Sequence, residues 1–219
     1  APRLVTGVNF YDQTQTVQDT FGHGTAISGA AAAVANNSIG VAGVPWGAQI
    51  MPLRTMNDLG WSQYADIANA IVYAADMGVD VINISIKGSS YSTVLQNAVN
   101  YAWIHDVVVV AAAGNDNNSL PGYPAALEHV IAVGATDVGD VRASFSNYGS
   151  WIDVSAPGRF IQTTTRGGSY GAWGGTSLAS PLVAGEVALI RSVNPDLTAQ
   201  QISDIVIRGV DDIGITGFD

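Results

Sequence analysis

Three short apolar runs along the chain lack the polar alternation of a half-buried strand. They cover 79–86 (VDVINISI), 107–113 (VVVVAAA) and 130–135 (VIAVGA). Each run is rich in Val, Ile or Ala and is bounded by Gly or Asn, which is typical of strands buried on both faces of a parallel sheet. We therefore expect these runs to form neighbouring strands in the centre of the molecule.

The segments around these runs have helical spacing instead. Apolar residues recur every three to four positions over 65–77 and 92–104, and Gly78 is a candidate C-cap of the first helix. Near the end of the chain, Thr198 and Gln201 predict a capping box at the start of a last helix. Strands that alternate with helices predict an α/β fold, here a doubly wound parallel sheet with helices on both faces.

Composition narrows the class of protein. The 219 residues are 47% apolar and 12% charged and include 25 glycines, which favours one compact domain over residues 1–219 and excludes a coiled coil. A net charge of −10 without a basic stripe argues against nucleic-acid binding. The absence of Cys excludes disulfides, thiolate zinc sites and a Cys nucleophile. With no apolar run near 18 residues, we expect no membrane partner.

Three polar motifs interrupt this apolar background. Gly22-His23-Gly24-Thr25 precedes a run of small residues over 26–35, Gly114-Asn115 directly follows the second predicted strand, and Gly174 to Pro181 (GGTSLASP) precedes an apolar helix over 182–190. Each motif has a structural interpretation: a His in a turn, a Gly-Asn turn that ends a strand, and a Ser or Thr that caps a helix.

The same motifs also supply the parts of a nucleophilic site. At a helix N-terminus, backbone N–H groups and the helix dipole would stabilise negative charge that develops beside the Ser177 hydroxyl. A serine nucleophile requires a base and an oxyanion donor, and His23 and Asn115 provide one of each. From the residues alone, the structural and the catalytic interpretations both remain open.

The order of the motifs resembles that of the subtilisin-like serine proteases, the subtilase family. The matching segments are GHGT, VDVINISIKG, VVVVAAAGN, YPAALEHVIAVGA, SFSNYG, DVSAPG and GGTSLASPLVAG, which together extend from about residue 22 to 208. The resemblance implies a secreted endopeptidase that acts on polypeptide substrates through an acyl-enzyme intermediate. His23 would be the general base and Ser177 the nucleophile, and Asn115 and the Ser177 N–H would form the oxyanion hole.

The triad acid of this family has no counterpart in the chain. It stands in a Val-Ile-Asp-Thr-Gly type motif upstream of the His, and nothing before Gly22 resembles that motif. Asp12 and Asp19 are the available carboxylates, but neither follows an apolar strand. We therefore expect a domain truncated at both ends, impaired by itself, with its own N-terminal segment or a prodomain as a partner. The alternative is an inactive truncated or pseudo-protease fragment with a peptide-binding cleft.

The resemblance also implies the substrate-binding residues. The segment Ser85, Ile86, Lys87 and Gly88 would pair with the substrate as an added antiparallel strand, and the P1 pocket would be lined by Ala112, Gly114 and Gly122. Because Gly114 and Gly122 have no side chains, the pocket should be deep, and it has no carboxylate at its base to pair with Arg or Lys. We therefore expect a preference for large apolar or aromatic P1 residues. Lys87 stands where the family has a small residue, and it either favours an acidic substrate side chain or is merely solvated.

A loop after the His motif resembles the strong calcium site of the family. Its ligands would be the Asn37 side-chain oxygen and backbone carbonyls of Ala35, Ile39 and Val41, which are the hard oxygen ligands that Ca²⁺ prefers. The family's carboxylate ligand aligns with Arg3. The sequence thus leaves two expectations open, a structural calcium ion or a loop without metal.

Overall fold

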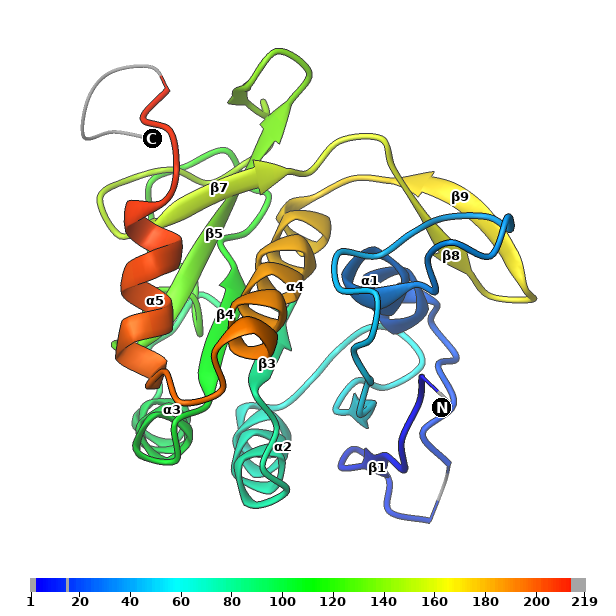
Figure 1. Cartoon of the computed structure of the whole chain (residues 1–219). Helices are drawn as coiled ribbons and strands as arrows, with labels where there is room; N and C mark the ends of the chain where they lie inside the picture. Colours follow the sequence, from blue (N-terminus) through cyan, green and yellow to red (C-terminus); the bar gives the residue numbers. More distant parts are fainter. Residues whose placement is uncertain (1–2, 15, 214–219) are drawn as a thin grey trace.

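The computed structural model describes residues 3–14 and 16–213. Its central sheet contains a run of parallel strands in the order β3 (Val81–Ile84), β4 (Val108–Ala112), β5 (Val130–Asp137) and β7 (Val154–Pro157) (Figure 1). The short strand β6 (Val141–Arg142) adds antiparallel to β5. The three apolar runs of the sequence are therefore neighbouring strands, as predicted, and the fold is α/β.

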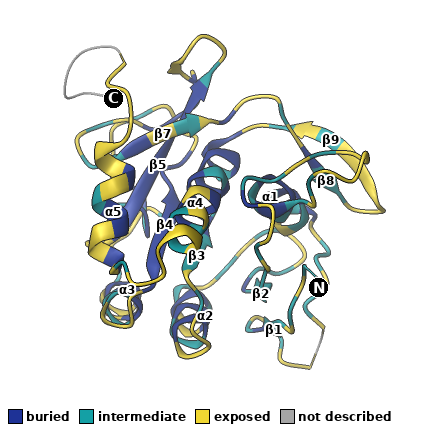
Figure 2. Ribbon diagram, in the orientation of Figure 1, coloured by how far each residue is buried: buried dark blue, intermediate teal, exposed yellow. Residues whose placement is uncertain are grey.

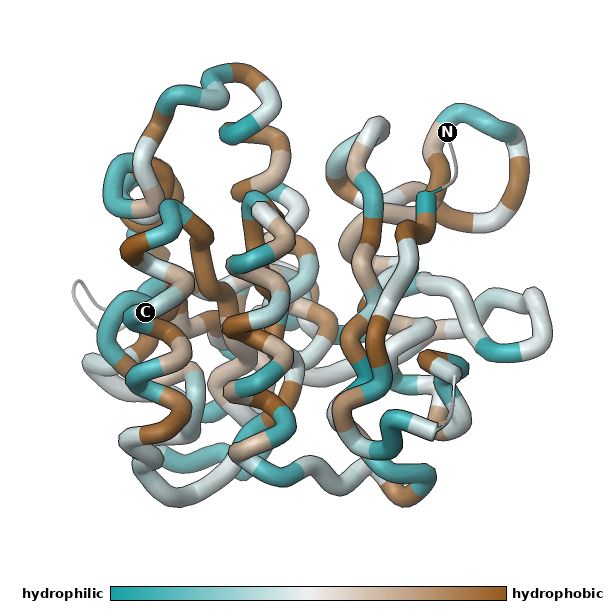
Figure 3. The backbone as a smooth tube through the Cα atoms, turned by 90° about the horizontal axis from the view of Figure 1, so that it is seen from below, coloured by the Kyte–Doolittle hydropathy of each residue, from teal (hydrophilic) through white to brown (hydrophobic). Residues whose placement is uncertain are grey.

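Helices cover both faces of this sheet because alternate residues of its strands point in opposite directions. In β4, Val109 and Ala111 belong to the core under α2 (Tyr64–Asp76) and α3 (Thr93–Ile104). Val108 and Val110 belong to the core under α4 (Thr176–Val193) and α5 (Ala199–Arg208). Figure 2 shows β4 and most of β5 in the buried colour, and Figure 3 shows hydrophobic stretches running through the same interior.

The helix boundaries confirm some predictions and correct others. Ser92 caps α3 by accepting a hydrogen bond from Leu95 N, and Thr198 forms the predicted capping box with Gln201. The helix predicted over 182–190 instead begins at Thr176, because Pro181 lies inside α4 rather than before it. The helix of small residues, α1 (His23–Ala32), begins at His23.

The N-terminal part of the chain lies beside the main sheet and is not joined to it by strand pairing. Strands β1 (Val8–Asn9) and β2 (Leu53–Arg54) form a separate parallel pair. The antiparallel hairpin of β8 (Ile161–Thr165) and β9 (Ser169–Trp173) packs against α1 (Figure 1). Within residues 3–14 and 16–213, β3 pairs with β4 alone, so its outer edge is open.

Candidate active site

Ser177 lies in the first turn of α4 and contacts the end of β3. Pro181 has no N–H, so it leaves the carbonyl of Ser177, four residues earlier, without its usual helical donor. The hydroxyl of Ser85 supplies that donor at 2.9 Å, and the Ser177 hydroxyl in turn lies 3.4 Å from the Ser85 carbonyl. The proline that misled the helix prediction thus helps to tie the start of α4 to the sheet.

Asn115 follows β4 and is oriented by the residue before Ser177. Its side-chain oxygen accepts hydrogen bonds from Thr176 N at 2.9 Å and from Thr176 Oγ1 at 3.1 Å. The Thr176 hydroxyl also accepts a bond from Gly114 N at 3.0 Å. Because its oxygen is engaged with Thr176, the exposed Asn115 keeps its amide Nδ2 as a donor with no acceptor among the described residues.

The Ser177 N–H is a second donor at this position. The neighbouring N–H groups are satisfied, that of Thr176 by Asn115 and that of Leu178 by the Gly175 carbonyl at 2.9 Å. In the part of the chain that the structure describes, Ser177 N has no hydrogen-bond acceptor. Unpaired N–H groups at a helix start bind anions, so the two donors form a site for developing negative charge.

His23 reaches the same region from the other side. It begins α1, which packs against α4, and its ring lies 6.5 Å from that of Trp173, four residues before Ser177. Burial lowers the pKa of the His23 imidazole, while the charge of Asp19 raises it in part. The imidazole is therefore neutral at neutral pH and able to accept a proton. No hydrogen bond joins His23 to Ser177 among the described residues.

Asp19, the carboxylate whose charge acts on His23, is already engaged. Its Oδ1 accepts the N–H of Gly22 at 2.6 Å, and its Oδ2 accepts the N–H and the hydroxyl of Thr25, each at 2.7 Å. Burial acts to raise the pKa of Asp19, but these hydrogen bonds outweigh it and hold the pKa below its usual value. Asp12, the other candidate, accepts hydrogen bonds from Thr14 within its own turn.

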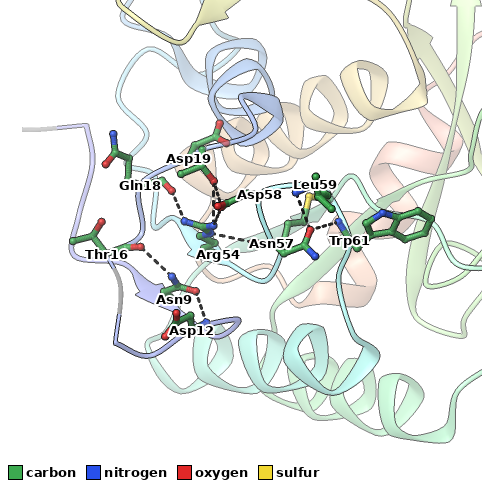
Figure 4. A network of polar contacts seen from close by, with 12 residues as sticks. Asn9, Asp12, Thr16, Gln18, Asp19, Arg54, Asn57, Asp58, Leu59 and Trp61 are labelled. Atoms are coloured by element: carbon green, nitrogen blue, oxygen red, sulfur yellow. Dashed lines mark hydrogen bonds and ion pairs between the residues drawn. The ribbon is translucent and has the colours of Figure 1, made fainter.

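Polar contacts hold the loop that leads to His23 (Figure 4). Arg54, at the end of β2, donates to the Gln18 carbonyl at 2.8 Å and forms an ion pair with Asp58 at 2.6 Å. The same Asp58 carboxylate accepts the Thr20 hydroxyl at 2.5 Å. The turn that follows carries two exposed apolar side chains, Leu59 and Trp61. The exposed Phe21, whose ring lies 6.4 Å from that of His23, is beside Gly60 of the same turn.

The residues predicted to bind substrate gather at the carboxyl ends of β3 and β4. Gly88 and Tyr123 exchange two backbone hydrogen bonds, of 2.7 and 2.9 Å, which brings the segment after β3 against the segment that holds Gly122. Ala112 ends β4, and Gly114 is buried two residues later. The side chain of Lys87 runs along both Gly114 and Gly122 and takes up part of the space beside them.

Three supporting residues were missed from the sequence. Thr176 fixes the orientation of Asn115, Asn147 accepts the Asp116 N–H at 2.9 Å, and the Asp116 carboxylate pairs with Lys87. Asn147 is 1% exposed, and a buried Asn requires such partners, but its burial cannot be read from its neighbours in the sequence. The signal for Asp116 was available, because Lys87 is the single lysine of the chain.

The calcium-like loop follows α1 and offers only neutral oxygens. Asn37 accepts the Ile39 N–H at 3.1 Å, and it lies beside the carbonyl-bearing residues Ala35 and Val41 in sequence. Arg3 donates to the Ala48 carbonyl at 2.9 Å and to the Trp46 carbonyl. Because this side chain is a cation, it supplies no negative charge to a bound calcium ion. Within the described ranges, no group of three or more His, Cys, Asp or Glu side chains is placed to hold a metal.

Comparison with known proteins gives a consistent result. The thermophilic serine proteinase of Bacillus sp. (strain AK1) is 48% identical over 190 residues, which cover 87% of this chain and 47% of that protein. Thermitase of Thermoactinomyces vulgaris is 44% identical over 217 residues, or 99% of this chain and 77% of thermitase. This chain thus spans only about half the length of some relatives, among them subtilisin E of Bacillus subtilis at 51%.

Solved structures agree with this comparison. A protease of Pseudoalteromonas arctica superposes with a TM-score of 0.90 at 32% identity, covering 96% of this chain and 78% of that one. A cold-adapted subtilisin-like serine proteinase gives 0.88 at 30% identity, with 98% and 77% covered. None of the helices within the described residues has the length and apolar character needed to cross a membrane. The family model of the subtilases matches residues 3–219, and the chain belongs to the subtilase family.

Proposed function

We propose that this chain is the catalytic core of a serine endopeptidase. His23 removes the proton of the Ser177 hydroxyl, and Ser177 Oγ attacks the scissile carbonyl of a polypeptide substrate. Asn115 Nδ2 and the Ser177 N–H donate to the resulting oxyanion. His23 then protonates the leaving amine as the C–N bond breaks, and water hydrolyses the acyl-enzyme with His23 again as the base.

The observation that carries this proposal is the pair of donors, Asn115 Nδ2 and Ser177 N, at the start of the helix that holds the Ser177 hydroxyl. Asn115 is held with its oxygen toward Thr176, and Ser177 N is unpaired in the described chain at the start of a long helix. An unpaired N–H is common at helix starts, so the distinguishing feature is the Asn115 amide, which Thr176 orients at the same helix start. A lowered His23 pKa supports the role of general base, because the base must be neutral to accept a proton.

The proposal includes an acid that residues 1–219 do not supply. Asp19 is the carboxylate acting on His23, and both of its oxygens are bonded to Gly22 and Thr25. We propose that an acid-bearing strand from a segment outside these residues, or from a partner, orients His23. The open edge of β3 supports this, because an unpaired strand edge accepts a further strand. Without the acid we expect kcat to be on the order of 10⁴-fold lower.

A fluorophosphonate probe with peptide mapping tests the site. We expect it to label Ser177 in the complete gene product, and we expect Ser177→Ala to abolish both labelling and peptide hydrolysis. Ser192→Ala, at the far end of the same helix, is the matched control and should keep both. Labelling at another residue, or hydrolysis that survives Ser177→Ala, would contradict the proposal.

The alternative is a fragment or pseudo-protease that binds peptides in an intact cleft without cleaving them. The hydrogen bonds of Asp19 to Gly22 and Thr25 favour this alternative, because they leave His23 without a carboxylate to orient its imidazole. Comparison of residues 1–219 with a chain extended upstream separates the two functions. The endopeptidase requires a large gain in hydrolysis on extension, whereas the binding module requires peptide binding with no hydrolysis in either chain.

The finer properties are part of the same proposal. We expect large apolar or aromatic P1 residues to be preferred over Arg and Lys, because the pocket has no carboxylate at its base for a basic side chain and the nearby Asp116 is already paired with Lys87. Secretion is expected from the family resemblance and is tested by where the product accumulates in culture. The loop with Asn37 is proposed as a weak calcium site, since ligand charge sets calcium affinity and its oxygens are neutral.

A further inference from the structure

The only lysine of the chain lies at the candidate P1 pocket. Lys87 is three residues beyond the end of β3, and the paired hydrogen bonds between Gly88 and Tyr123 fix the backbone beside it. Its side chain is 26% exposed, which is low for a lysine on a loop. The position of this side chain therefore requires an explanation.

The aliphatic part of Lys87 packs against two glycines. A Cβ atom on Gly114 would lie 2.5 Å from Lys87 Cδ, and one on Gly122 would lie 2.9 Å from Lys87 Cγ. Both distances are far below van der Waals contact, so any side chain at either glycine would displace the lysine. The stem of Lys87 thus occupies space that the absence of two side chains creates.

The ammonium group is held by an anchored partner. It forms an ion pair with the Asp116 carboxylate, and the hydrogen bond from Lys87 lowers the pKa of that carboxyl. The Asp116 N–H donates to the buried Asn147, whose Nδ2 donates to the Ala113 carbonyl at 3.0 Å. Asp116 is 49% exposed, however, and exposed ion pairs are weak. The backbone is rigid here, but the pair itself can open.

We propose that Lys87 is a gate of the P1 pocket, closed by its ion pair with Asp116. This inference rests on the proposed function, because it assigns a role within the same substrate cleft. A large P1 side chain enters between Gly114 and Gly122 only after Lys87 rotates toward solvent. A P1 alanine is too short to require that movement. The closed gate therefore hinders large P1 residues more than small ones. It reduces the preference for large P1 residues that the space beside Gly114 and Gly122 would otherwise produce.

Kinetics on matched substrates test the gate in the complete gene product. The measured quantity is the ratio of kcat/KM for a P1 Phe substrate to that for a P1 Ala substrate. We expect Lys87→Gly to raise this ratio about tenfold, as expected for one to two methylene groups of pocket space. Asp116→Asn keeps the Lys87 side chain but removes its ion-pair partner, so this variant should raise the ratio about threefold.

Asp80→Asn is the control, since Asp80 pairs with Arg191 before β3, at the opposite end of that strand. It should leave the ratio unchanged. A ratio that does not rise in Lys87→Gly overturns the gate even though both substrates are cleaved. Absence of cleavage in every variant, wild type included, overturns the proposed function instead.

A modification experiment tests the gate without catalysis. Lys87 is the only lysine of residues 1–219, and peptide mapping distinguishes its modification by an amine reagent such as trinitrobenzenesulfonate from that of the terminal amine or of any other lysine in the gene product. An N-acetylated peptide product ending in Phe should speed modification of Lys87 severalfold, because its side chain displaces the ammonium from Asp116. The same peptide ending in Ala should not. Protection of Lys87 by the Phe peptide would overturn the gate.

Discussion

Two regions of this molecule contribute residues to the candidate active site, and different interactions hold each region in place. The region of β3 to β7 with α2 to α5 is built on buried strands, and every residue of β4 is buried. The region of β1, β2 and the loop before α1 has strands of only two residues, and Arg54, Asp58 and Thr20 tie it together through exposed polar contacts. The nucleophile and oxyanion donors belong to the first region, and His23 follows the second.

The difference shows which part of the site depends on hydrophobic packing. Apolar burial is strong and is not screened by salt, whereas exposed ion pairs contribute little. Ser177 is therefore held on a helix that packs into the core, and the exposed Asn115 is oriented by the buried Thr176 of the same helix. The orientation of His23 depends on local hydrogen bonds of Asp19 and on the packing of α1 against α4 and β8. We expect four perturbations to separate the two regions.

The largest expected difference is in stability. Leu95→Ala removes a side chain that is 0% exposed in the core under α3, and it should lower the free energy of unfolding by about 2–5 kcal/mol. Leu53→Ala, in the half-buried strand β2, should cost about 1 kcal/mol. Urea unfolding of the two variants provides the measurement. Equal costs would show that both regions share one core.

The next effect concerns the oxyanion site, which lies in the region of β3 to β7 with α2 to α5. Asn115→Ala removes the donor that Thr176 orients, and kcat should fall about 10²–10³-fold. It also removes the acceptor of the buried Thr176 N–H, so the melting temperature should fall as well, and kcat is measured well below it. Asn118→Ala, in the same loop, is the control. If Asn118→Ala lowered kcat as much as Asn115→Ala, the loss would come from loop structure rather than from a donor.

A smaller effect is expected from Asp19, which lies in the loop before α1. Its negative charge raises the pKa of His23, so Asp19→Asn should lower that pKa further and move the acid limb of the kcat/KM profile to lower pH. The variant should also lose about 1 kcal/mol of stability with its hydrogen bonds to Gly22 and Thr25. Titration of His23 by NMR checks the direction. A shift to higher pH would show that Asp19 does not act through charge.

Calcium should have the smallest effect, and it should act at the loop of Asn37, which follows α1. A site of neutral oxygens with a Kd of about 1 mM would stabilise the fold by about 1.4 kcal/mol at about 10 mM Ca²⁺. The melting temperature should then rise by about 3–5 °C. Asn37→Ala should remove the rise, and Mg²⁺ should not reproduce it. A melting temperature that is the same in CaCl₂ and in chelator would exclude calcium from this loop.

Much of the fold followed from the sequence because the apolar signal was strong. The runs at 107–113 and 130–135 are Val- and Ala-rich, and they form β4 and β5 with boundaries within two residues. The caps at Ser92 and Thr198 were also predictable, since capping depends on neighbours within one turn. The start of α4 was not, because Pro181 normally marks a helix start and only the contact between Ser85 and Ser177 makes it tolerable inside the helix.

The sequence by itself determined the identities and order of the chemical groups: His23, Asn115 and Ser177 stand in motifs that carry the resemblance to the subtilases. Only the tertiary structure decided how these groups face one another. Asn115 owes its orientation to Thr176, 61 residues away, and Lys87 owes its position to Gly114, Gly122 and Asp116. Local patterns record periodicity and caps, whereas the direction of a side chain depends on partners that the fold brings together from distant segments.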